Sequence, residues 1–171
     1  MEQIERYIRN IDDFPKPGIQ FKDITPLLAN RAATEHCLNL LVAMVGDKKI
    51  DKVVGIESRG FFFGILLAQR FNAGFIPIRK PGKLPFHTLK EPYELEYGMD
   101  ALEIHEDGIK RGERVLLHDD VLATGGTARA ACNLVEKMGG EIVQFNFLLE
   151  IEFLKGNLKL QDYAVRSLLK Y

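Results

Sequence analysis

Strands and helices are predicted to alternate along most of the chain, as judged from the spacing of its apolar residues. Short β-branched or apolar runs predict strands over residues 53–57, 74–80, 115–120 and 142–150. Helical spacing predicts helices over residues 33–44, 61–71 and 128–135. This alternation predicts an α/β fold with a mostly parallel sheet flanked by helices, in which ligands bind beyond the carboxyl ends of the strands.

Two segments interrupt this pattern. Near the start, a short helix is expected over residues 4–11, and the Pro- and Gly-containing residues 14–30 predict an irregular but ordered segment; we call residues 1–32 the flap. Residues 93–105 alternate apolar and acidic positions around a turn at Gly98–Asp100, which predicts a projecting hairpin. We call residues 80–108 the lid, because a long insertion at a ligand-binding edge is typical of one.

Length and charge narrow the possible classes of protein. A chain of 171 residues that is 46% hydrophobic is expected to form one domain over residues 1–171. With 23 basic and 24 acidic residues it has no global basic field, so neither nucleic acid nor a membrane is expected as a partner, and any anion needs a local site. Two distant cysteines, and the lack of a signal-like or membrane-spanning stretch, favour a cytoplasmic protein.

The loop Ala123–Thr127, ATGGT, is the first candidate for chemistry, because it lies between a predicted strand and a predicted helix. Glycines allow backbone N–H groups to approach a ligand closely, and the following helix N-terminus favours an anion, so a phosphate fits. The loop matches neither the P-loop nor the dinucleotide-binding pattern. Alternatively, Gly125 and Gly126 only make a tight turn, with Thr127 as the helix N-cap.

Asp119 and Asp120 favour the phosphate interpretation, because they place two carboxylates at the strand end just before that loop. Such carboxylates can accept hydrogen bonds from sugar hydroxyls or hold Mg2+ through its water shell. Neighbouring strand residues point to opposite faces, so the two need not contact the same ligand. Either one could instead be a surface carboxylate or a loop cap.

This acidic pair followed by a phosphate loop resembles the type I phosphoribosyltransferases. The resemblance implies binding of phosphoribosyl pyrophosphate (PRPP), with its ribose on Asp119 and Asp120. It assigns the sugar phosphate to Ala123, Thr124, Gly125, Gly126 and Thr127. It also implies Mg2+ as cofactor, held mainly by PRPP with a contact through water to Asp119.

Further stretches resemble the adenine phosphoribosyltransferases within that family: FPKPGIQFKDITPLL, ESRGFFFG, IRKPGKLP, YELEYGMDALEIH, LLEIEFLKG and the terminal LLKY. The resemblance implies purine salvage, in which adenine and PRPP give AMP and pyrophosphate. It assigns pyrophosphate to Ser58, Arg59, Arg79 and Lys83, with a catalytic role for Arg59. It also implies a homodimer, across which Arg79 can reach, and a cis peptide bond beside Ser58.

The lid and the flap are expected to recognise the base. By resemblance, Glu96 on the lid handles the proton at the imidazole side of adenine, with Tyr97 beside it. Glu94 is expected on the same strand face as Glu96 but lies outside the Glu-Tyr-Gly motif. Gln20 would read the base through its backbone, Phe21 would stack on it and Lys22 would add a polar contact. An oxopurine as acceptor, or a PRPP-sensing regulator without catalysis, are the alternatives.

The chain departs from the family's pattern at three positions. Lys22 stands where arginine is frequent, and Pro81 stands where a charged or polar residue is common, which removes a phosphate contact. His118 stands where small or β-branched apolar residues are usual, and a histidine within a strand most often belongs to the core or to an interface.

Overall fold

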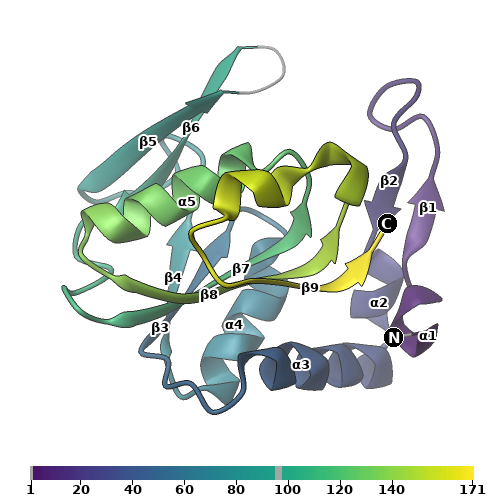
Figure 1. Cartoon of the computed structure of the whole chain (residues 1–171), viewed down its shortest axis with the longest axis horizontal. Helices are drawn as coiled ribbons and strands as arrows, with labels where there is room; N and C mark the ends of the chain where they lie inside the picture. The colour runs from purple at the N-terminus through teal and green to yellow at the C-terminus, as the bar shows by residue number, and fades with distance from the viewer. Residues whose placement is uncertain (1, 95–97) are drawn as a thin grey trace.

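A parallel sheet forms the centre of the molecule in the computed structural model, which describes residues 2–94 and 98–171 (Figure 1). Within these residues the sheet has five strands in the order β4-β3-β7-β8-β9, and each neighbouring pair is parallel. The strands are β3 (Lys52–Ile56), β4 (Gly74–Ile78), β7 (Arg114–Leu122), β8 (Glu141–Glu150) and β9 (Val165–Lys170). The predicted mostly parallel sheet is therefore confirmed.

Helices cover both faces of this sheet (Figure 1). Helices α3 (Arg31–Val45) and α4 (Gly60–Arg70) lie on one face, and α5 (Gly126–Lys137) lies on the other. Each face has its own cluster of buried side chains, centred on Phe63 and Leu148 beneath α4 and on Phe145 and Leu134 beneath α5. Among the described residues, no helix combines the length and the apolarity that a membrane span requires.

The flap is more regular than predicted. It consists of α1 (Glu2–Glu5), β1 (Arg9–Ile11), β2 (Phe21–Asp23) and α2 (Thr25–Ala29). The helix expected over residues 4–11 is wrong beyond Glu5, because residues 9–11 pair antiparallel with residues 21–23. The local apolar spacing that suggested a helix is explained by Ile4 and Ile8, which are both buried in the core.

The lid forms the predicted hairpin, with β5 (Thr88–Glu94) antiparallel to β6 (Met99–His105), and it projects from the body in Figure 1. The turn is misplaced in the prediction, because Met99 and Asp100 already pair with Glu94 and Tyr93. The root of the hairpin packs on α5 and buries Leu102 and Ile104 completely. The hairpin is thus anchored at its base and extends outward from it.

Two short 3-10 helices connect β8 to β9: η1 (Glu152–Leu154) and η2 (Gly156–Leu160). They lie beyond the carboxyl end of β8, and the C-terminal strand β9 returns beside β8. As Figure 1 shows, the C-terminus lies next to β2. This arrangement brings residues 151–156 and Tyr171 opposite the flap.

Candidate active site

Asp119 and Asp120 lie within β7, and the strand does not stop at them as the sequence suggested. It continues to Leu122 because the longer strand β8 goes on pairing with it up to Glu150. The side chain of Asp120 is buried and forms an ion pair with Arg59, with 2.8 Å between Nε and Oδ2. Asp119 is partly exposed, and its Oδ1 accepts the backbone N–H of Asp120 at 2.9 Å.

Burial raises the pKa of both carboxyl groups above the ordinary range for aspartate. The neighbouring Asp120 carboxylate raises the pKa of Asp119 further, whereas the Arg59 guanidinium opposes the rise at Asp120. In the free protein, therefore, the charged form of this pair is poorly compensated. Hydrogen-bond donors from a ligand could supply the missing compensation.

The loop Ala123–Thr127 encloses a cavity of about 90 Å³ together with Asp119 and the start of α5. Gly125 has a φ of 77°, and a Cβ there would lie 2.4 Å from the carbonyl oxygen of Gly156, so only glycine fits. Gly125 is also the N-cap of α5, which makes the interpretation with Thr127 as the N-cap wrong. The first backbone N–H groups of α5 have no partner within the helix and face an anion-sized space.

The predicted loop Ser58–Gly60 begins α4 directly after β3. Its Glu57–Ser58 peptide bond is cis, at one of the two positions expected. Arg59 points toward the flap. Besides its ion pair with Asp120, its Nη1 donates to the Lys22 carbonyl at 3.3 Å and its guanidinium lies 4.7 Å from the centre of the Phe21 ring. The structure thus places Arg59 between the carboxylate pair and the flap.

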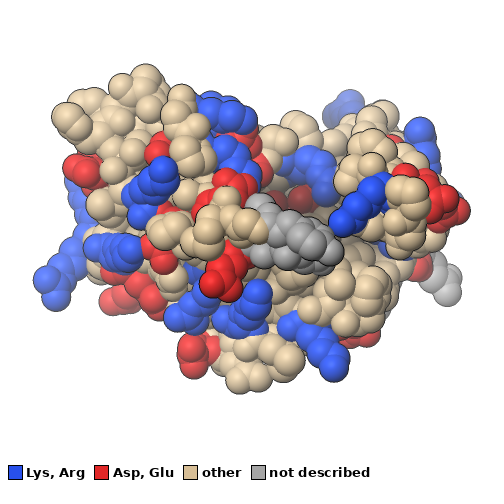
Figure 2. Space-filling model, turned by 90° about the horizontal axis from the view of Figure 1, so that it is seen from above, with Lys and Arg blue, Asp and Glu red and all other residues tan. Residues whose placement is uncertain are grey.

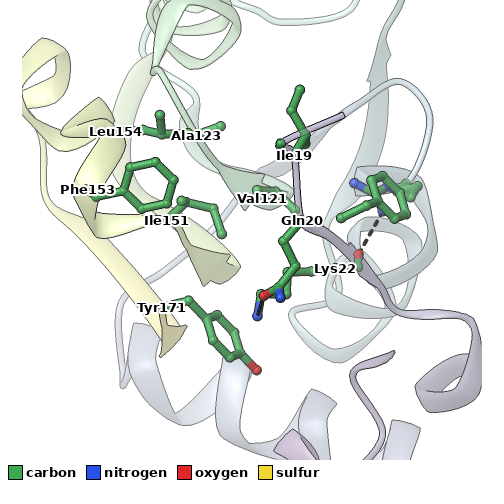
Figure 3. Close-up of a pocket in the computed structure, with 12 residues that line it drawn as sticks. Ile19, Gln20, Lys22, Val121, Ala123, Ile151, Phe153, Leu154 and Tyr171 are labelled. Atoms are coloured by element: carbon green, nitrogen blue, oxygen red, sulfur yellow. Dashed lines mark hydrogen bonds between the residues drawn. The ribbon is translucent and has the colours of Figure 1, made fainter. Parts of the chain in front are cut away.

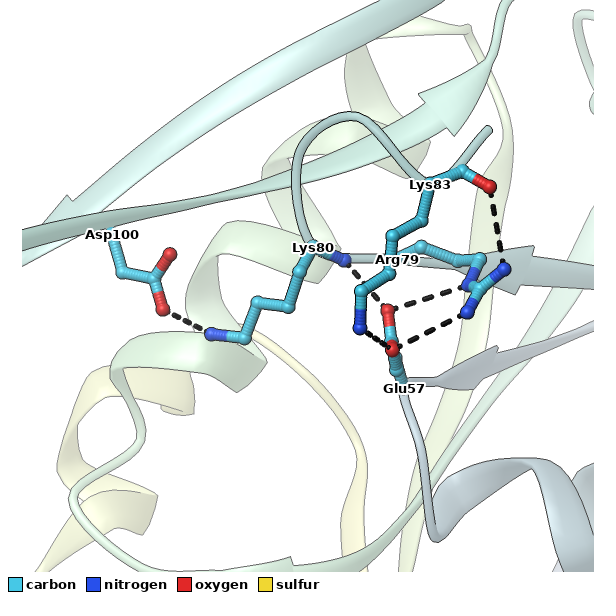
Figure 4. Close-up of polar contacts among 5 residues, drawn as sticks. All are labelled: Glu57, Arg79, Lys80, Lys83 and Asp100. Carbon is cyan, nitrogen blue, oxygen red and sulfur yellow. Dashed lines mark hydrogen bonds and ion pairs between the residues drawn. The ribbon is translucent and has the colours of Figure 1, made fainter. Parts of the chain in front are cut away.

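Arg79 and Lys83 converge on Glu57 at the end of β3 (Figure 4). Arg79 Nε lies 3.3 Å from Glu57 Oε2, Lys83 pairs with Oε1, and the backbone N–H of Lys80 donates to Oε2 at 2.9 Å. Although burial opposes it, these hydrogen bonds lower the Glu57 pKa to about 2. Two of the three cationic side chains predicted to bind pyrophosphate, Arg79 and Lys83, are therefore held beside an internal carboxylate.

Lys80 is turned the other way, toward the hairpin strands β5 and β6 (Figure 4). Its Nζ pairs with Asp100 and donates to the Tyr93 hydroxyl at 2.6 Å. The sequence reasoning assigned a role to neither Glu57 nor Asp100. The signal for Glu57 was its place directly before the Ser-Arg-Gly loop, at the end of a buried strand.

A second cavity, of about 460 Å³, lies between the flap and the C-terminal segment (Figure 3). Gln20, Phe21 and Lys22 line it, as predicted for a base site. The Gln20 side chain donates to Asp12 at 2.9 Å and accepts from Lys22 Nζ at 2.9 Å. Because that side chain is held by the flap, a ligand would meet the Gln20 backbone.

Lys22 is buried, and its ammonium group is used within the protein. Its Nζ donates to Asn10 Oδ1 at 2.8 Å and lies 3.8 Å from the centre of the Tyr171 ring. Burial lowers the pKa of Lys22. In this structure the Lys22 head group therefore joins the flap to the C-terminus, where a contact with the base was expected.

The sequence reasoning did not identify the wall of the cavity that faces the flap. This wall comes from the end of β7 and the C-terminal segment, with the lining residues Val121, Ala123, Ile151, Phe153, Leu154 and Tyr171. The available signal was the motif LLEIEFLKG and the terminal LLKY, which were noted only as points of resemblance. Because these C-terminal stretches lie far along the chain from the flap, the sequence did not show that they face it across one cavity.

Glu96 and Tyr97, the predicted catalytic and lid residues, lie outside the described residues. The described strand β5 ends at Glu94, whose side chain is exposed. Its carbonyl oxygen lies near Gly126, at 3.2 Å from where a Cβ would stand. The lid therefore passes close to the phosphate-sized cavity just before the residues in question.

Acidic and basic side chains are interspersed on the face seen in Figure 2 and form no single basic field there. This distribution agrees with a net charge of −1. Binding of a strongly anionic ligand would then depend on local groups, namely the N-terminus of α5 and the cationic cluster around Glu57.

The parallel sheet carries a carboxylate pair, an anion-sized loop cavity and an adjoining apolar cavity at its carboxyl edge. This is the arrangement of a phosphoribosyltransferase. The phosphoribosyl transferase domain model matches residues 23–167, so the chain belongs to that family.

Its relatives narrow the family further. Adenine phosphoribosyltransferase of Flavobacterium johnsoniae is 64% identical over 169 residues, which cover 99% of each chain. The solved adenine phosphoribosyltransferase of Thermoanaerobacter pseudethanolicus superimposes with a TM-score of 0.97 at 49% identity, covering 99% of each chain. The Saccharomyces cerevisiae enzyme, solved with an imino-altritol bisphosphate and adenine, has a TM-score of 0.93 at 40% identity, covering 98% of this chain and 97% of that one. The chain groups with the adenine phosphoribosyltransferases.

Proposed function

We propose that this chain transfers the phosphoribosyl group of PRPP to adenine and forms AMP and pyrophosphate, a purine salvage reaction. One observation carries the proposal: the phosphate-sized cavity and the apolar cavity adjoin, since Val121 and Ala123 line both. A nucleoside monophosphate has its phosphate and base at opposite ends of one sugar. The carboxylate pair on the same strand is positioned to bind that sugar.

In this proposal the residues at the end of β7 bind the ribose phosphate. Asp119 and Asp120 accept hydrogen bonds from the ribose hydroxyls, and the backbone of Ala123–Thr127 donates to the phosphate. Each charge-assisted hydrogen bond is worth ~1.5–3 kcal/mol, so several of them can hold a phosphate without a cationic side chain. The raised pKa values of the aspartates support this role, since hydroxyl donors would stabilise their charged forms.

Pyrophosphate leaves as negative charge develops on it, and Ser58, Arg59, Arg79 and Lys83 would stabilise that charge. Arg79 and Lys83 must exchange Glu57 for the leaving group, and Arg59 must turn or act from beside Asp120. The anomeric carbon then becomes oxocarbenium-like and is attacked by adenine from the other face. The lid excludes water that would otherwise hydrolyse this centre.

Mg2+ is the proposed cofactor. Within the described part of the chain, no three His, Cys, Asp or Glu side chains lie close enough together to form a metal site. Asp119 is partly exposed at the edge of the phosphate cavity, so one carboxylate and the substrate phosphates fit the usual mode of Mg2+ binding. When bound, the ion would neutralise phosphate charge, and Asp119 would contact it through water.

Adenine would occupy the apolar cavity, with the Gln20 backbone reading its pairing edge. Because a backbone N–H and C=O pair complements an amine better than a carbonyl, this site favours adenine over an oxopurine. Glu96 would handle the proton at the imidazole ring of the base, and Tyr97 would close beside it.

The reaction and its lid residue can be tested together. Purified protein is incubated with PRPP, Mg2+ and adenine, hypoxanthine, guanine or xanthine, and nucleotide formation is followed for wild type, Glu96→Ala and Glu94→Ala. We expect AMP from adenine, a loss of about 100-fold or more in Glu96→Ala and little change in Glu94→Ala. Preference for an oxopurine, or PRPP binding without turnover, would refute the proposed function; equal losses in both variants would refute the role of Glu96.

We further propose that residues 1–171 act as a single domain in a cytoplasmic homodimer, with the flap and the lid closing on one site. Phe62 and Ile65 on α4 are 46% and 52% exposed and lie one helical turn apart, which supports a covered apolar face. Cys37 and Cys132 are buried and unbridged, as suits a reducing compartment. Analytical ultracentrifugation of wild type and Ile65→Glu tests the dimer, because the added charge should release monomers.

A further inference from the structure

Phe153 is unusually exposed for a large apolar residue. Its side chain is 77% exposed, the highest value among the large hydrophobic residues in the described part of the chain. It also lines the 460 Å³ cavity, together with Ile19, Val121 and Ile151. Figure 3 shows its ring extending from the C-terminal segment toward the flap. An exposed ring in an apolar cavity is suited to a flat ligand.

The aromatic residue predicted to stack on the base is Phe21, but its ring already has protein neighbours. The Arg59 guanidinium lies 4.7 Å from the ring centre, a cation–π arrangement. Phe14 meets the same ring edge to face, with 5.1 Å between centroids and 74° between planes. Phe153 has no such neighbours among the aromatic and cation–π contacts of the described residues, so it has the ring surface more available to a ligand.

The backbone around Phe153 is fixed relative to the phosphate loop. The N–H of Ile151 donates to the Leu122 carbonyl at 2.9 Å, and the N–H of Glu152 donates to the Tyr171 carbonyl at 2.8 Å. Three residues further on, a Cβ on Gly156 would lie 2.1 Å from the Ala123 carbonyl oxygen, so these two backbones are in direct contact. The backbone that carries the ring therefore has a set position relative to the phosphate-sized cavity, which lowers the entropic cost of stacking.

We propose that Phe153 is the aromatic wall of the base site, which stacks on the purine while the flap reads its edge. The inference rests on the proposed function and extends it, since it assigns base affinity to the C-terminal segment as well as to the flap. A stacking residue holds the base equally in the ground state and in the transition state. Its removal should therefore raise the KM for the base and leave kcat nearly unchanged.

The test compares steady-state kinetics of wild type, Phe153→Ala, Phe153→Tyr and Leu158→Ala with adenine and PRPP. Leu158 is the matched control, because it is 57% exposed on the neighbouring helix η2 and does not line the cavity. We expect Phe153→Ala to raise the KM for adenine about tenfold, with the KM for PRPP and kcat within about twofold of wild type. Phe153→Tyr, which keeps the ring, should restore the KM, and Leu158→Ala should resemble wild type.

Three results would overturn the inference: an unchanged KM for adenine in Phe153→Ala, a rise in both KM values to the same extent, or an equal effect in Leu158→Ala. Thermal unfolding of each variant separates these from loss of fold, and an exposed side chain should leave the midpoint unchanged. If wild type itself forms no AMP, the proposed function fails. If wild type is active and only the Phe153 comparison fails, the proposed function stands and the inference does not.

Discussion

Aspartates lie at both ends of strand β7, in opposite electrostatic environments. At its amino end, Arg114 donates three hydrogen bonds of 2.8–2.9 Å to Asp51, the residue before β3: two from its guanidinium and one from its backbone. These hydrogen bonds lower the pKa of Asp51 to about 2. At the carboxyl end, burial raises the pKa values of Asp119 and Asp120, and the Asp120 carboxylate raises that of Asp119 further.

The difference indicates which end of β7 stabilises the fold and which end is suited to binding a ligand. The carboxylate of Asp51 has its donors inside the protein, so it stabilises the free chain. The pair at the other end has one cationic partner, Arg59, and one backbone donor to Asp119, which leave the raised pKa values uncompensated until a ligand adds donors. Buried carboxylates whose charge is poorly compensated within the protein are typical of functional sites.

The largest expected effect comes from Asp119→Asn. Removing this charge should lower kcat/KM for PRPP about 100-fold to 1,000-fold, because the ribose hydroxyls lose a charged acceptor close to the reacting carbon. The free protein should become more stable at pH 7.5. When the pKa of a carboxyl group is higher in the folded than in the unfolded protein, the protein loses stability as the pH rises above the unfolded pKa. Asparagine does not ionise, so the variant lacks this loss. AMP formation and urea unfolding measure both effects.

Asp119→Asn should therefore combine lower activity with higher stability. A variant that loses activity and stability together would show that Asp119 supports the fold, and the two ends of β7 would no longer differ. Asn and Asp have nearly the same shape, so a change of packing would not explain such a result. The unfolding slope with urea should stay the same in both proteins.

The next effect concerns the middle of the same strand. His118 is completely buried, with its Nδ1 2.7 Å from Asn146 Oδ1, and burial lowers its pKa to about 4 despite that contact. Because its folded pKa lies below the unfolded value, stability should be lost as pH falls from about 6.5 to about 4, by up to about 3 kcal/mol. His118→Val should lose this dependence, as urea unfolding at pH 7.5 and pH 5 would show.

The comparison uses the difference between the two proteins at each pH, because the raised pKa values of Asp119 and Asp120 give a pH dependence of the opposite sign. A charge change common to wild type and variant cancels in that difference. If the difference is the same at both pH values, His118 has no part in acid sensitivity. Asn146→Leu is the companion variant, and it should cost about 1–3 kcal/mol at pH 7.5 because the His118 ring loses its partner.

The sequence allowed prediction of the features that are contiguous along the chain. The alternating pattern predicted the parallel sheet, since apolar runs bounded by glycine are strong local signals. The stretch 119–127 could be interpreted because carboxylates, loop and helix start follow one another directly. The strand at Arg9–Ile11 was missed because its partner, residues 21–23, lies beyond a loop, and pairing overrides local helical spacing.

Features that depend on distant residues could not be predicted. Glu57 meets Arg79 and Lys83 only because β3 and β4 are adjacent in the sheet. The C-terminal wall of the 460 Å³ cavity, with Phe153 and Tyr171, lies more than 130 residues from Gln20 along the chain and yet opposite it in space. Neither arrangement has a local pattern, so only the three-dimensional structure reveals them.

The smallest effect is expected at the amino end of β7. Asp51→Asn should lower the urea midpoint at pH 7.5 modestly, because both side chains of the ion pair are partly exposed and water already screens it. The stability difference from wild type should shrink as pH falls below about 4, toward the folded pKa of about 2. Wild-type Asp51 then becomes protonated and, like asparagine, carries no charge. The KM values for adenine and PRPP should stay unchanged, since the pair lies at the end of the sheet away from both cavities. A change in either KM in a fully folded Asp51→Asn protein would mean that the amino end of β7 influences the site, and that the division between a structural end and a ligand-binding end is incorrect.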